Sequence, residues 1–492
     1  MKTQGLSQHI SSQSKWPLHD VAQTQALEHH AKNGLAACTL MQRAGLATAK
    51  LALAIAPHGQ KIWLACGPGN NGGDGIEAAI HLRAWGKEPI VTWIGQNGHC
   101  PVDAQQAWDR AKAAGVTFTN HIPEQFDLAI DALLGIGTQR PPEEVMLQWL
   151  EALQATTATV LCVDVPTGLR ANTGEWIAPI PRIHRNAQRH TLSLLTLKPG
   201  LFTADGRDAA GEVWFNDLGV TGAPPPIAWQ QTSAPTSEVK PHSSHKGSFG
   251  DVSIIGGAPG MSGAALLAAL GALHGGAGRV FAGVMDSSTH QAITAAHPSL
   301  MVRMHTDIDL QANTVVCGCG GGQRIHALLP HVLSASKQLV LDADALNAIA
   351  ADTSLQTLLK SRSARHKPTV LTPHPLEAAR LLSCTAHDVQ SNRLNAAQQL
   401  AHTFQCVVVL KGSGTLVASP HHTSVLNGSG NALLATAGTG DVLAGFIGAT
   451  IARHDNTFEA TCRAVFAHGQ VADEWPSEGP ALDAALLAAS VR

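Results

Sequence analysis

The stretch KIWLACGPGNNGGDGIEAAIHLRAWG, residues 61–86, contains the pattern that decides the fold. It begins as an apolar run, continues through a loop with five glycines, and ends in a segment with the composition of a helix. A strand that leads through a glycine-rich turn into a helix is the opening unit of a parallel α/β sheet. Free backbone N–H groups and the positive end of the helix face the same space at such a turn, so an anion site is expected there.

The same alternation of apolar runs and alanine-rich helical stretches extends through the rest of the chain. Strands that are buried on both faces read as continuous apolar runs, and their alternation with helices predicts parallel sheets. In the first half the other runs are PIVTWIG (89–95), DLAIDALLG (127–135) and TVLCVDVP (159–166). In the second half they are DVSIIGG (251–257), NTVVCGCG (313–320), QLVLDAD (338–344), PTVLTPH (368–374) and CVVVLKG (406–412).

A break in this alternation divides the chain. Residues 221–241 are rich in Pro, Ser and Thr and lack helical or strand periodicity, which is typical of a linker. We therefore expect two α/β domains, residues 1–222 and 241–492, joined by a linker over residues 223–240. In such domains ligands bind beyond the carboxyl ends of the strands.

Composition excludes several classes of protein. With 44% hydrophobic and 14% charged residues among 492, the chain is expected to be globular. A formal net charge of -3 argues against general nucleic-acid binding. No apolar run approaches the roughly 18 residues of a membrane span, so a soluble protein is expected. Nine scattered cysteines and the absence of an apolar leader indicate the cytoplasm, and the close pair Cys317 and Cys319 is expected to be buried rather than metal-binding.

Two interpretations of the first glycine-rich loop are open, a tight turn and a binding loop. Its spacing is neither that of a dinucleotide fingerprint nor that of a phosphate loop with its lysine. Asn70, Asn71 and Asp74 are packed among the glycines, which cost backbone entropy on folding, and this favours a binding loop.

Oxygen-bearing side chains follow two further strands of the first half. These are Asp131, and Asp164 with Thr167. Carboxylates at the ends of apolar strands are costly unless they bind something, and a site shared with Asn71 would suit a hard cation. Lys198 is a candidate proton donor, although an isolated lysine is more often a solvated surface residue.

The motifs of the first half, in their order, resemble the NAD(P)HX epimerase domain over about residues 20–220. In that family the substrate is NADH or NADPH hydrated at carbon 6 of the nicotinamide ring, and the enzyme interconverts the two epimers. The resemblance implies a Rossmann-like three-layer α/β/α fold. The motifs are LMQRAG, GPGNNGGDG, DALLGIGTQR, VDVPTGL and LKPGL.

The same resemblance implies roles for individual residues. Asp164 would contact the hydrated ring and share the proton transfers with Lys198, and Asn71, Asp131 and Thr167 would bind potassium. Thr167 stands where serine is usual and keeps the hydroxyl, whereas Glu77 stands where an aliphatic residue is common. The dinucleotide would be held by Asn70, Asn71, Gly72, Gly73, Asp74, Gly135, Ile136, Gly137, Thr138, Gln139, Arg140, Pro141 and Asp164.

The second half has its own glycine-rich junction, LATAGTGDVLAG (434–445). Apolar residues at 443, 446, 447 and 451 lie on one helical face, so Gly438–Gly440 should form the turn before a helix. A helix end gains only about 0.3–1 kcal/mol from one exposed charge, so a nucleotide needs further donors, and VVLKGSGT (408–415) offers Lys411 and a small-residue loop. Asp441 is interpreted as a general base, with a helix N-cap as the alternative.

These motifs resemble the ribokinase-like dehydratase domain of bifunctional bacterial repair enzymes over about residues 240–490. The resemblance implies a ribokinase-like α/β/α fold and a reaction in which ADP, or ATP in some relatives, phosphorylates the carbon 6 hydroxyl of the S epimer before phosphate leaves. The motifs are HKGSFGDVSIIGG, MSGAA, DADALN, LTPHPLEAARLL, VVLKGSGT and GTGDVLAG.

The resemblance again assigns residues. Asp441 would be the base, and Glu377 would order magnesium. Cys319, in GCGGG (318–322), stands where proline is common, which loosens the turn that holds Gly320. The nucleotide would contact Lys411, Gly412, Ser413, Gly414, Thr415 and Gly440, and the hydrated substrate would contact Ala264, Gly320, His374 and Asp441.

The sequence therefore predicts a two-domain repair enzyme acting on NADHX and NADPHX with ADP, potassium and magnesium, without nucleic-acid or membrane partners, as a homo-oligomer. The alternative is a ribokinase-like kinase of a vitamin precursor or sugar with a non-catalytic N-terminal domain. Histidine pairs such as His29 with His30 and His421 with His422 lack metal-ligand spacing and are expected on the surface.

Overall fold

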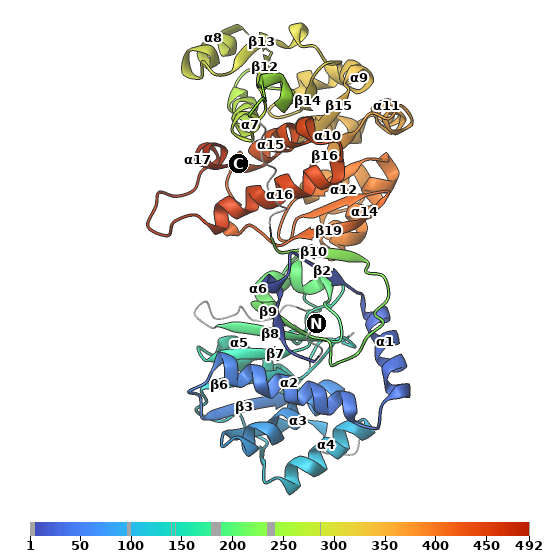
Figure 1. Cartoon of the computed structure of the whole chain (residues 1–492), viewed down its shortest axis with the longest axis vertical. Coiled ribbons are helices and arrows are strands. Elements are labelled where there is room, and N and C mark those ends of the chain that lie inside the picture. The colour runs from blue at the N-terminus through green and yellow to red at the C-terminus, as the bar shows by residue number, and fades with distance from the viewer. Residues whose placement is uncertain are drawn as a thin grey trace. The chain divides into compact units, whose positions relative to one another are not determined.

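The computed structural model of the chain describes residues 5–95, 100–138, 140–142, 144–178, 188–233, 242–285 and 287–491. The chain divides into two compact units, Met1–Ala228 and Trp229–Arg492. Both alternate strands with helices, which confirms the predicted two-part α/β fold (Figure 1). Part of the expected linker forms a strand, β10 (Ala228–Gln231), and residues 234–240 of it lie outside the described residues.

Unit 1 contains a largely parallel sheet with the strand order β1-β9-β8-β7-β6-β3-β4-β5. The pairs from β9 to β5 are parallel, and β1 joins the edge in the antiparallel direction. Its strands are β1 (Gln8–His9), β3 (Lys61–Cys66), β4 (Glu88–Trp93), β5 (Thr117–Thr119), β6 (Leu128–Ala132), β7 (Thr159–Val163), β8 (Arg189–Leu194) and β9 (Glu212–Asn216). The unit also contains β2 (Lys15–Leu18), α1 (Val21–Gly34), α2 (Thr39–Ile55), α3 (Asn70–Ala84), α4 (Val102–Ala113), α5 (Glu144–Ala155) and α6 (Gly206–Ala210).

The two faces of this sheet form two separate hydrophobic cores. Along β3, Ile62 and Leu64 pack into a core with α2, α3 and α4, whereas Trp63 and Ala65 pack into another with α5. Successive side chains of a strand point to opposite faces, so a continuous apolar run is what a sheet covered on both sides requires. Unit 1 is therefore a three-layer α/β/α structure, as predicted.

Unit 2 contains a second sheet, with the strand order β13-β12-β11-β14-β15-β16-β17-β18-β19-β10. Its strands besides β10 are β11 (Asp251–Ile255), β12 (Arg279–Val284), β13 (Met301–Met304), β14 (Thr314–Cys317), β15 (Gln338–Leu341), β16 (Thr369–Leu371), β17 (Val407–Leu410), β18 (Leu416–Ser419) and β19 (His422–Asn427). Its helices are α7 (Ser262–His274), α8 (Ser287–Ala296), α9 (Ile325–Ala335), α10 (Ala343–Ala351), α11 (Thr353–Ala364), α12 (Pro375–Leu382), α13 (Ala386–Ser391), α14 (Arg393–Phe404), α15 (Thr439–Arg453), α16 (Thr457–Asp473) and α17 (Ala484–Ser490).

Not all of the second sheet is parallel. The strands from β13 to β17 pair in parallel, but β17, β18 and β19 form antiparallel pairs. A parallel crossover needs a dozen or more residues, whereas residues 411–415 and 420–421 are connections that only hairpins allow. The loop with Lys411 is therefore a hairpin connection at the end of β17.

Helix α15 lies against the sheet through the face predicted from its sequence. Leu443, Phe446, Ile447 and Ile451 are buried in one core with Val252 of β11. Its N-cap is Gly438, whose φ of +90° is a conformation that glycine adopts without strain. Among the described residues, no helix has the length and apolar character that crossing a membrane would require.

Candidate active sites

A cavity of about 360 Å³ opens at the carboxyl ends of the strands in unit 1. It receives residues from α1, α2, the start of α3 and the loops after β6 and β7. Of the predicted residues, Asn70, Asn71, Asp74, Asp164 and the run Gly135–Thr138 line it. Arg140 and Pro141 are exposed and are not among its lining residues, and Gln139 lies outside the described residues.

The predicted binding loop differs in form from expectation. Helix α3 begins at Asn70, so Asn70–Asp74 form its first turns rather than an open loop. The helix can start there because Gly72 has no Cβ, which would lie 1.9 Å from the carbonyl oxygen of Gly67. The glycines thus bring the helix end close to the strand end, and two asparagines and an aspartate extend from it toward the cavity.

Asp164 is the predicted catalytic group that faces this cavity, and Lys198 lies behind it. Lys198 is fully buried, and Nζ donates to Oδ1 of Asp164 and, over 2.7 Å, to the carbonyl oxygen of Leu194. Burial lowers the pKa of Lys198, while the charge of Asp164 opposes that change. Asp164 has a φ of +69°, a left-handed conformation that turns the chain sharply after β7. The pair therefore presents a carboxylate to the cavity, and a buried lysine on the other side of that carboxylate holds it by a hydrogen bond.

Asp131 and Thr167, two of the three predicted potassium ligands, are in direct contact. Thr167 donates its hydroxyl to Oδ1 of Asp131 over 2.6 Å and its backbone N–H to Oδ2 over 3.0 Å. Burial raises the pKa of Asp131, and these hydrogen bonds oppose the rise. The third, Asn71, lies beside Gly135, where a Cβ would stand 3.3 Å from Oδ1 of Asn71. Nδ2 of Asn71 is buried without a hydrogen-bond partner.

Several charged residues of this cavity were not predicted. Glu28 and Lys32 of α1 form an ion pair of 2.6 Å at its wall, and Asp103 of α4 also lines it. Burial, with the charge of Asp164, raises the pKa of Asp74 well above its ordinary value. Glu28 and Lys32 are spaced as a helical i,i+4 pair, but that spacing is common on exposed helix faces and identifies no site.

Glu77, the departure noted in the sequence, has a structural partner. Its side chain is buried on α3 and accepts a hydrogen bond of 2.7 Å from Arg110 of α4. The helix α2 passes so close that a Cβ on Gly45 would lie 2.5 Å from Cβ of Glu77. The acidic residue therefore contributes to the packing of three helices.

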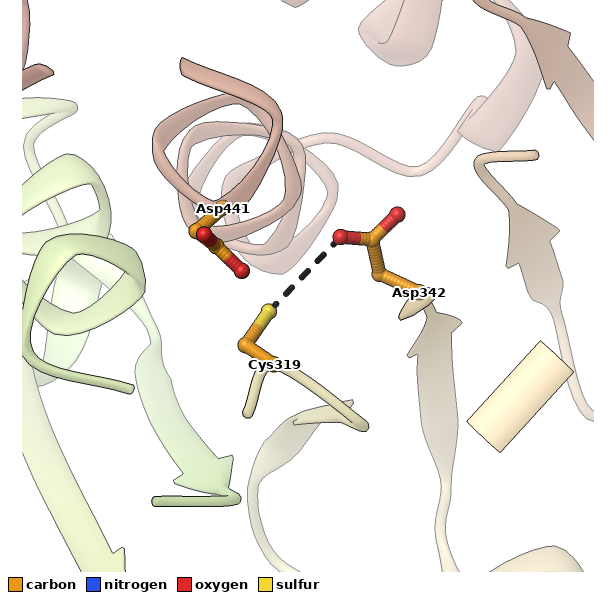
Figure 2. Close-up of side chains that lie close together, drawn as sticks. All are labelled: Cys319, Asp342 and Asp441. Atoms are coloured by element: carbon orange, nitrogen blue, oxygen red, sulfur yellow. Dashed lines mark hydrogen bonds between the residues drawn. The ribbon is translucent and has the colours of Figure 1, made fainter. Parts of the chain in front are cut away.

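The second site lies where β14, β15 and α15 end or begin in unit 2. Asp441, in the first turn of α15, approaches Cys319 and Asp342 so that one ligand atom of each lies within 4.8 Å of the others (Figure 2). Burial, with the negative charge of Asp342, raises the pKa of Asp441 to about 6. The N-cap of α15 is Gly438, not Asp441. The capping alternative for Asp441 is therefore wrong, because the N-cap lies three residues earlier.

Lys411 brings a positive charge to this helix end. Its Nζ donates to Oδ1 of Asp342 over 2.7 Å and lies 3.3 Å from where a Cβ on Gly440 would stand. Although burial opposes it, the charges of Asp342 and Glu377 raise the pKa of Lys411. The ammonium group therefore stays protonated beside the first N–H groups of α15, which is an arrangement suited to phosphate.

A buried arginine forms hydrogen bonds with the backbone at the start of the connection between β17 and β18. Arg393 donates to the carbonyl oxygens of Leu410 and Lys411 over 3.3 Å and 3.1 Å. Gly412 and Gly414 have φ values of +128° and +62°, so the loop reverses direction within a few residues. Thr415 closes it with a hydrogen bond of 3.0 Å to the carbonyl oxygen of Gly412.

The predicted substrate contacts of unit 2 fall into two places. Gly320, with a φ of +60°, lies against α7, where a Cβ would stand 3.0 Å from Cβ of Ala264. His374 instead caps α12, and its Nδ1 accepts from the N–H groups of Leu376 and Glu377. Although burial opposes it, the hydrogen bonds from His374 lower the pKa of Glu377. Glu377 is therefore ionised within this cap.

Three residues of this second site, Asp342, Thr372 and His468, were not predicted as functional. Asp342 follows β15 and also accepts a hydrogen bond of 2.6 Å from Thr372, which follows β16. His468 of α16 is buried at 3.0 Å from the carbonyl oxygen of Thr439, and burial lowers its pKa to about 4. The position of Asp342 at a strand end was a usable signal, since ligands gather there. His29, His30, His421 and His422 are exposed, as predicted, and Cys317 and Cys319 are buried.

Comparisons with known proteins cover both units. Residues 252–491 match the family model of NAD(P)H-hydrate dehydratase, and residues 37–200 match that of the N-terminus of YjeF-related proteins. The chain is 36% identical to the bifunctional NAD(P)H-hydrate repair enzyme Nnr of Escherichia coli over 464 residues, which are 89% of this chain and 85% of that protein.

Two further relatives match unit 2. The ADP-dependent (S)-NAD(P)H-hydrate dehydratase of Neisseria meningitidis is 42% identical over 254 residues, covering 50% of this chain and 84% of that protein. The crystal structure of an ADP/ATP-dependent NAD(P)H-hydrate dehydratase from Bacillus subtilis, co-crystallised with ATP and Mg²⁺, is 30% identical, with a TM-score of 0.45, covering 52% of this chain and 92% of that one.

Proposed function

The chain belongs to the family of bifunctional NAD(P)H-hydrate repair enzymes, and we propose that it repairs hydrated NADH and NADPH in two steps. Unit 1 interconverts the R and S epimers of NADHX and NADPHX. Unit 2 dehydrates the S epimer with ADP, the nucleotide named for the relative from Neisseria meningitidis. We assign the epimerase domain to residues 1–222 and the dehydratase domain to residues 241–492, with residues 223–240 between them.

One observation carries the assignment of the dehydratase: a half-buried carboxyl, Asp441, lies at a helix N-terminus that also receives Lys411. Phosphate is attracted by the free N–H groups of the helix end and by the ammonium group. A carboxylate in that position can accept the proton of an alcohol as its oxygen attacks the terminal phosphoryl group. The side chains therefore suit phosphoryl transfer to a hydroxyl.

The chemistry of the dehydration balances with these groups. Asp441 takes the proton of the carbon 6 hydroxyl, whose oxygen forms a bond to the terminal phosphorus of ADP while the bond to AMP breaks. The carbon–oxygen bond of the phosphorylated ring then breaks and a ring proton is lost, which leaves NADH or NADPH and inorganic phosphate. Phosphorylation is useful because hydroxide is a poor leaving group and phosphate a good one.

We assign the nucleotide to the hairpin connection and the helix end of unit 2. The phosphates would be held by Lys411 and the N–H of Gly440, and the rest by Gly412, Ser413, Gly414 and Thr415. Magnesium, which prefers oxygen ligands, would shield the charge of the phosphates when bound. Asp342 and Glu377 supply ionisable carboxyls beside Lys411, and these suit the hydration shell of magnesium. Ala264, Gly320 and His374 are assigned to the hydrated substrate.

The epimerase assignment depends on the cavity of unit 1. Of the carboxyl groups that line it, Asp164 is the one paired with a fully buried lysine, so we assign to Asp164 the proton exchange with the hydrated ring. Lys198 contacts Asp164 but is not among the residues that line the cavity, so it acts through Asp164 as a positioning residue. The dinucleotide is assigned to Asn70–Asp74 and to Gly135–Pro141 around the same opening.

Potassium fits the donor set of Asp131, Thr167 and Asn71. A carboxylate, a hydroxyl and a side-chain amide are oxygen-bearing groups of the kind that hard cations prefer. The amide nitrogen of Asn71 is buried without a partner, and exchanging the positions of its nitrogen and oxygen would turn an acceptor toward the same space. A bound cation would offset the cost of burying Asp131 as a charge.

Thr167→Val should raise the potassium concentration needed for half-maximal epimerisation by about tenfold or more. The change keeps the shape of the side chain but removes the hydroxyl, whereas the control Thr167→Ser keeps it. Melting temperatures measured with and without KCl give a second readout, because a bound ion stabilises the folded state. Equal potassium dependence of both variants and the parent would contradict the assignment.

We also infer a cytoplasmic location and a homo-oligomer for this protein. The first rests on cysteines scattered without paired spacing, which is typical of a reducing compartment. The second rests on analogy with soluble enzymes, most of whose assemblies contain identical subunits.

The function is tested by incubating the full chain with hydrated NADH and ADP and following the absorbance of the reduced nicotinamide ring. Recovery of NADH with release of AMP and phosphate is expected, with ATP run in parallel to compare the two donors. Accumulation of a stable phosphorylated product without recovered NADH would favour the alternative, a small-molecule kinase of the same fold. When only the R epimer is supplied, recovery of NADH requires the epimerase activity as well.

A further inference from the structure

Cys319, Asp342 and Asp441 form a compact group of side chains, and the proposed phosphoryl transfer uses the two carboxyls but not the thiol. The three come from different parts of unit 2, namely the turn after β14, the end of β15 and the first turn of α15. Figure 2 shows the thiol and the two carboxyls directed toward one another. One ligand atom of each lies within 4.8 Å of the others, a spacing that a single metal ion can bridge.

The hydrogen bonds around Asp342 leave one of its oxygens for this group. Oδ1 accepts from Lys411 over 2.7 Å and from Thr372 over 2.6 Å, which fixes the carboxyl plane. Oδ2 faces Sγ of Cys319 at 3.9 Å. Cys319 is fully buried and Asp342 nearly so, whereas Asp441 is half-buried and gives access from solvent. Oδ2 of Asp342 and Sγ of Cys319 are thus placed beside each other before any ion arrives.

We propose that these three side chains bind Zn²⁺, or another thiophilic divalent cation, as an inhibitory site at the dehydratase centre. A thiolate with two carboxylate oxygens is a ligand set that zinc accepts, whereas magnesium prefers oxygen and water. Binding displaces the proton of the Cys319 thiol into solvent as the metal–sulfur bond forms. A water molecule at the Asp441 side completes a tetrahedral set.

Zinc at this position is incompatible with phosphoryl transfer. The oxygen of Asp441 that holds the metal cannot accept the proton of the substrate hydroxyl at the same time. This consequence rests on the proposed function of unit 2, whereas binding of the metal does not. Epimerisation depends on a different cavity, in unit 1, and is expected to be insensitive to zinc.

Binding is tested with Cd²⁺, because a cadmium–thiolate bond gives an ultraviolet charge-transfer band that needs no substrate. The parent for this test carries Cys384→Ala, which removes an exposed thiol elsewhere in unit 2. One equivalent of Cd²⁺ per chain is expected to give the band, and an excess of Zn²⁺ to reverse it. Cys319→Ser and Cys319→Ala, each in the same parent, are expected to abolish the band. A band that persists in both variants, or no band in the parent, would overturn the proposal.

Inhibition is measured as the dehydration rate with Zn²⁺ divided by the rate of the same variant without it. A zinc concentration that lowers the dehydration rate of the parent at least tenfold should leave the rate of each Cys319 variant within twofold of its own zinc-free value. Circular dichroism confirms that the variants are folded, and the epimerase rate shows that unit 1 is intact. Equal inhibition of parent and variants would overturn the proposal. If dehydration is absent from all of them, the proposed function fails, and the cadmium band still decides the metal site.

Discussion

Asp441→Asn should lower the rate of dehydration by about 10²–10⁴-fold, the usual contribution of a general base, and should leave epimerisation unchanged. The amide keeps the size of the side chain but cannot accept the proton of the substrate hydroxyl. Because Asp441 lies at the N-terminus of α15 beside Lys411, the phosphates should still bind, so the KM for ADP should change far less than kcat. Steady-state kinetics with hydrated NADH and ADP measure both.

The pH dependence identifies the base independently of the variant. Burial, with the charge of Asp342, raises the pKa of Asp441 to about 6, and a general base acts only when it is deprotonated. The dehydration rate should therefore be constant above this pKa and should fall tenfold per pH unit well below it. The residual activity of Asp441→Asn should lack this acidic limb, measured at saturating ADP with the substrate epimer supplied directly.

Loss of helix structure would not explain such a result. Gly438 is the N-cap of α15, so no capping bond of Asp441 is lost. Asparagine and aspartate have similar helix propensities, and the lost charge in the first turn costs only about 0.3–1 kcal/mol. The melting temperature of unit 2 should therefore stay within a few degrees of the parent value. Dehydration at the parental rate in Asp441→Asn would remove the assignment of the base, whereas a parallel loss of epimerisation would indicate general damage to the chain.

The layers of the fold could be predicted from the sequence because each central strand is buried on both faces. The predicted run KIWLAC coincides with β3, and CVVVLKG contains β17. The antiparallel hairpins after β17 could not be separated from the parallel strands by hydrophobicity, since both are buried. What distinguishes them is the length of their connections, which the periodicity of the apolar residues does not weigh.

Candidate residues at the ends of strands and at the start of α15 could also be predicted. Asp131, Asp164 and Asp441 each follow an apolar or glycine-rich junction, and the structure places each beside a partner. The contributions of α1 and α4 to the cavity of unit 1 could not be predicted, because Glu28 and Asp103 lie far from these motifs in sequence. Only tertiary packing brings them there.

The environment of a side chain was the least predictable property. An isolated lysine such as Lys198 is usually solvated, yet it is fully buried, because Asp164 and the carbonyl at the end of β8 accept its hydrogen bonds. Cys319 was expected to be a small buried residue, which is correct, but its contact with Asp342 depends on two strand ends meeting across the sheet.

Lys198→Met should reduce the free energy of unfolding of unit 1 by about 3 kcal/mol and abolish measurable epimerisation. Removing one partner of a buried ion pair typically costs about 3–5 kcal/mol, because the other charge is left uncompensated. The side chain of Asp164 is 12% exposed, so water reaches the carboxylate that has lost its lysine partner. The lower end of that range is therefore expected. Urea unfolding followed by tryptophan fluorescence reports mainly on unit 1, which contains most of the ten tryptophans.

The double variant Asp164→Asn with Lys198→Met separates the structural role of the pair from its catalytic role. With both charges removed, no buried charge is left unpaired, so much of the lost stability should return. Asparagine also tolerates the left-handed backbone that Asp164 adopts, with its φ of +69°. Epimerisation should nevertheless stay undetectable, because the carboxylate assigned to the proton exchange is absent. Recovered epimerisation in the double variant would show that the pair only supports the fold and that the proton passes through another group.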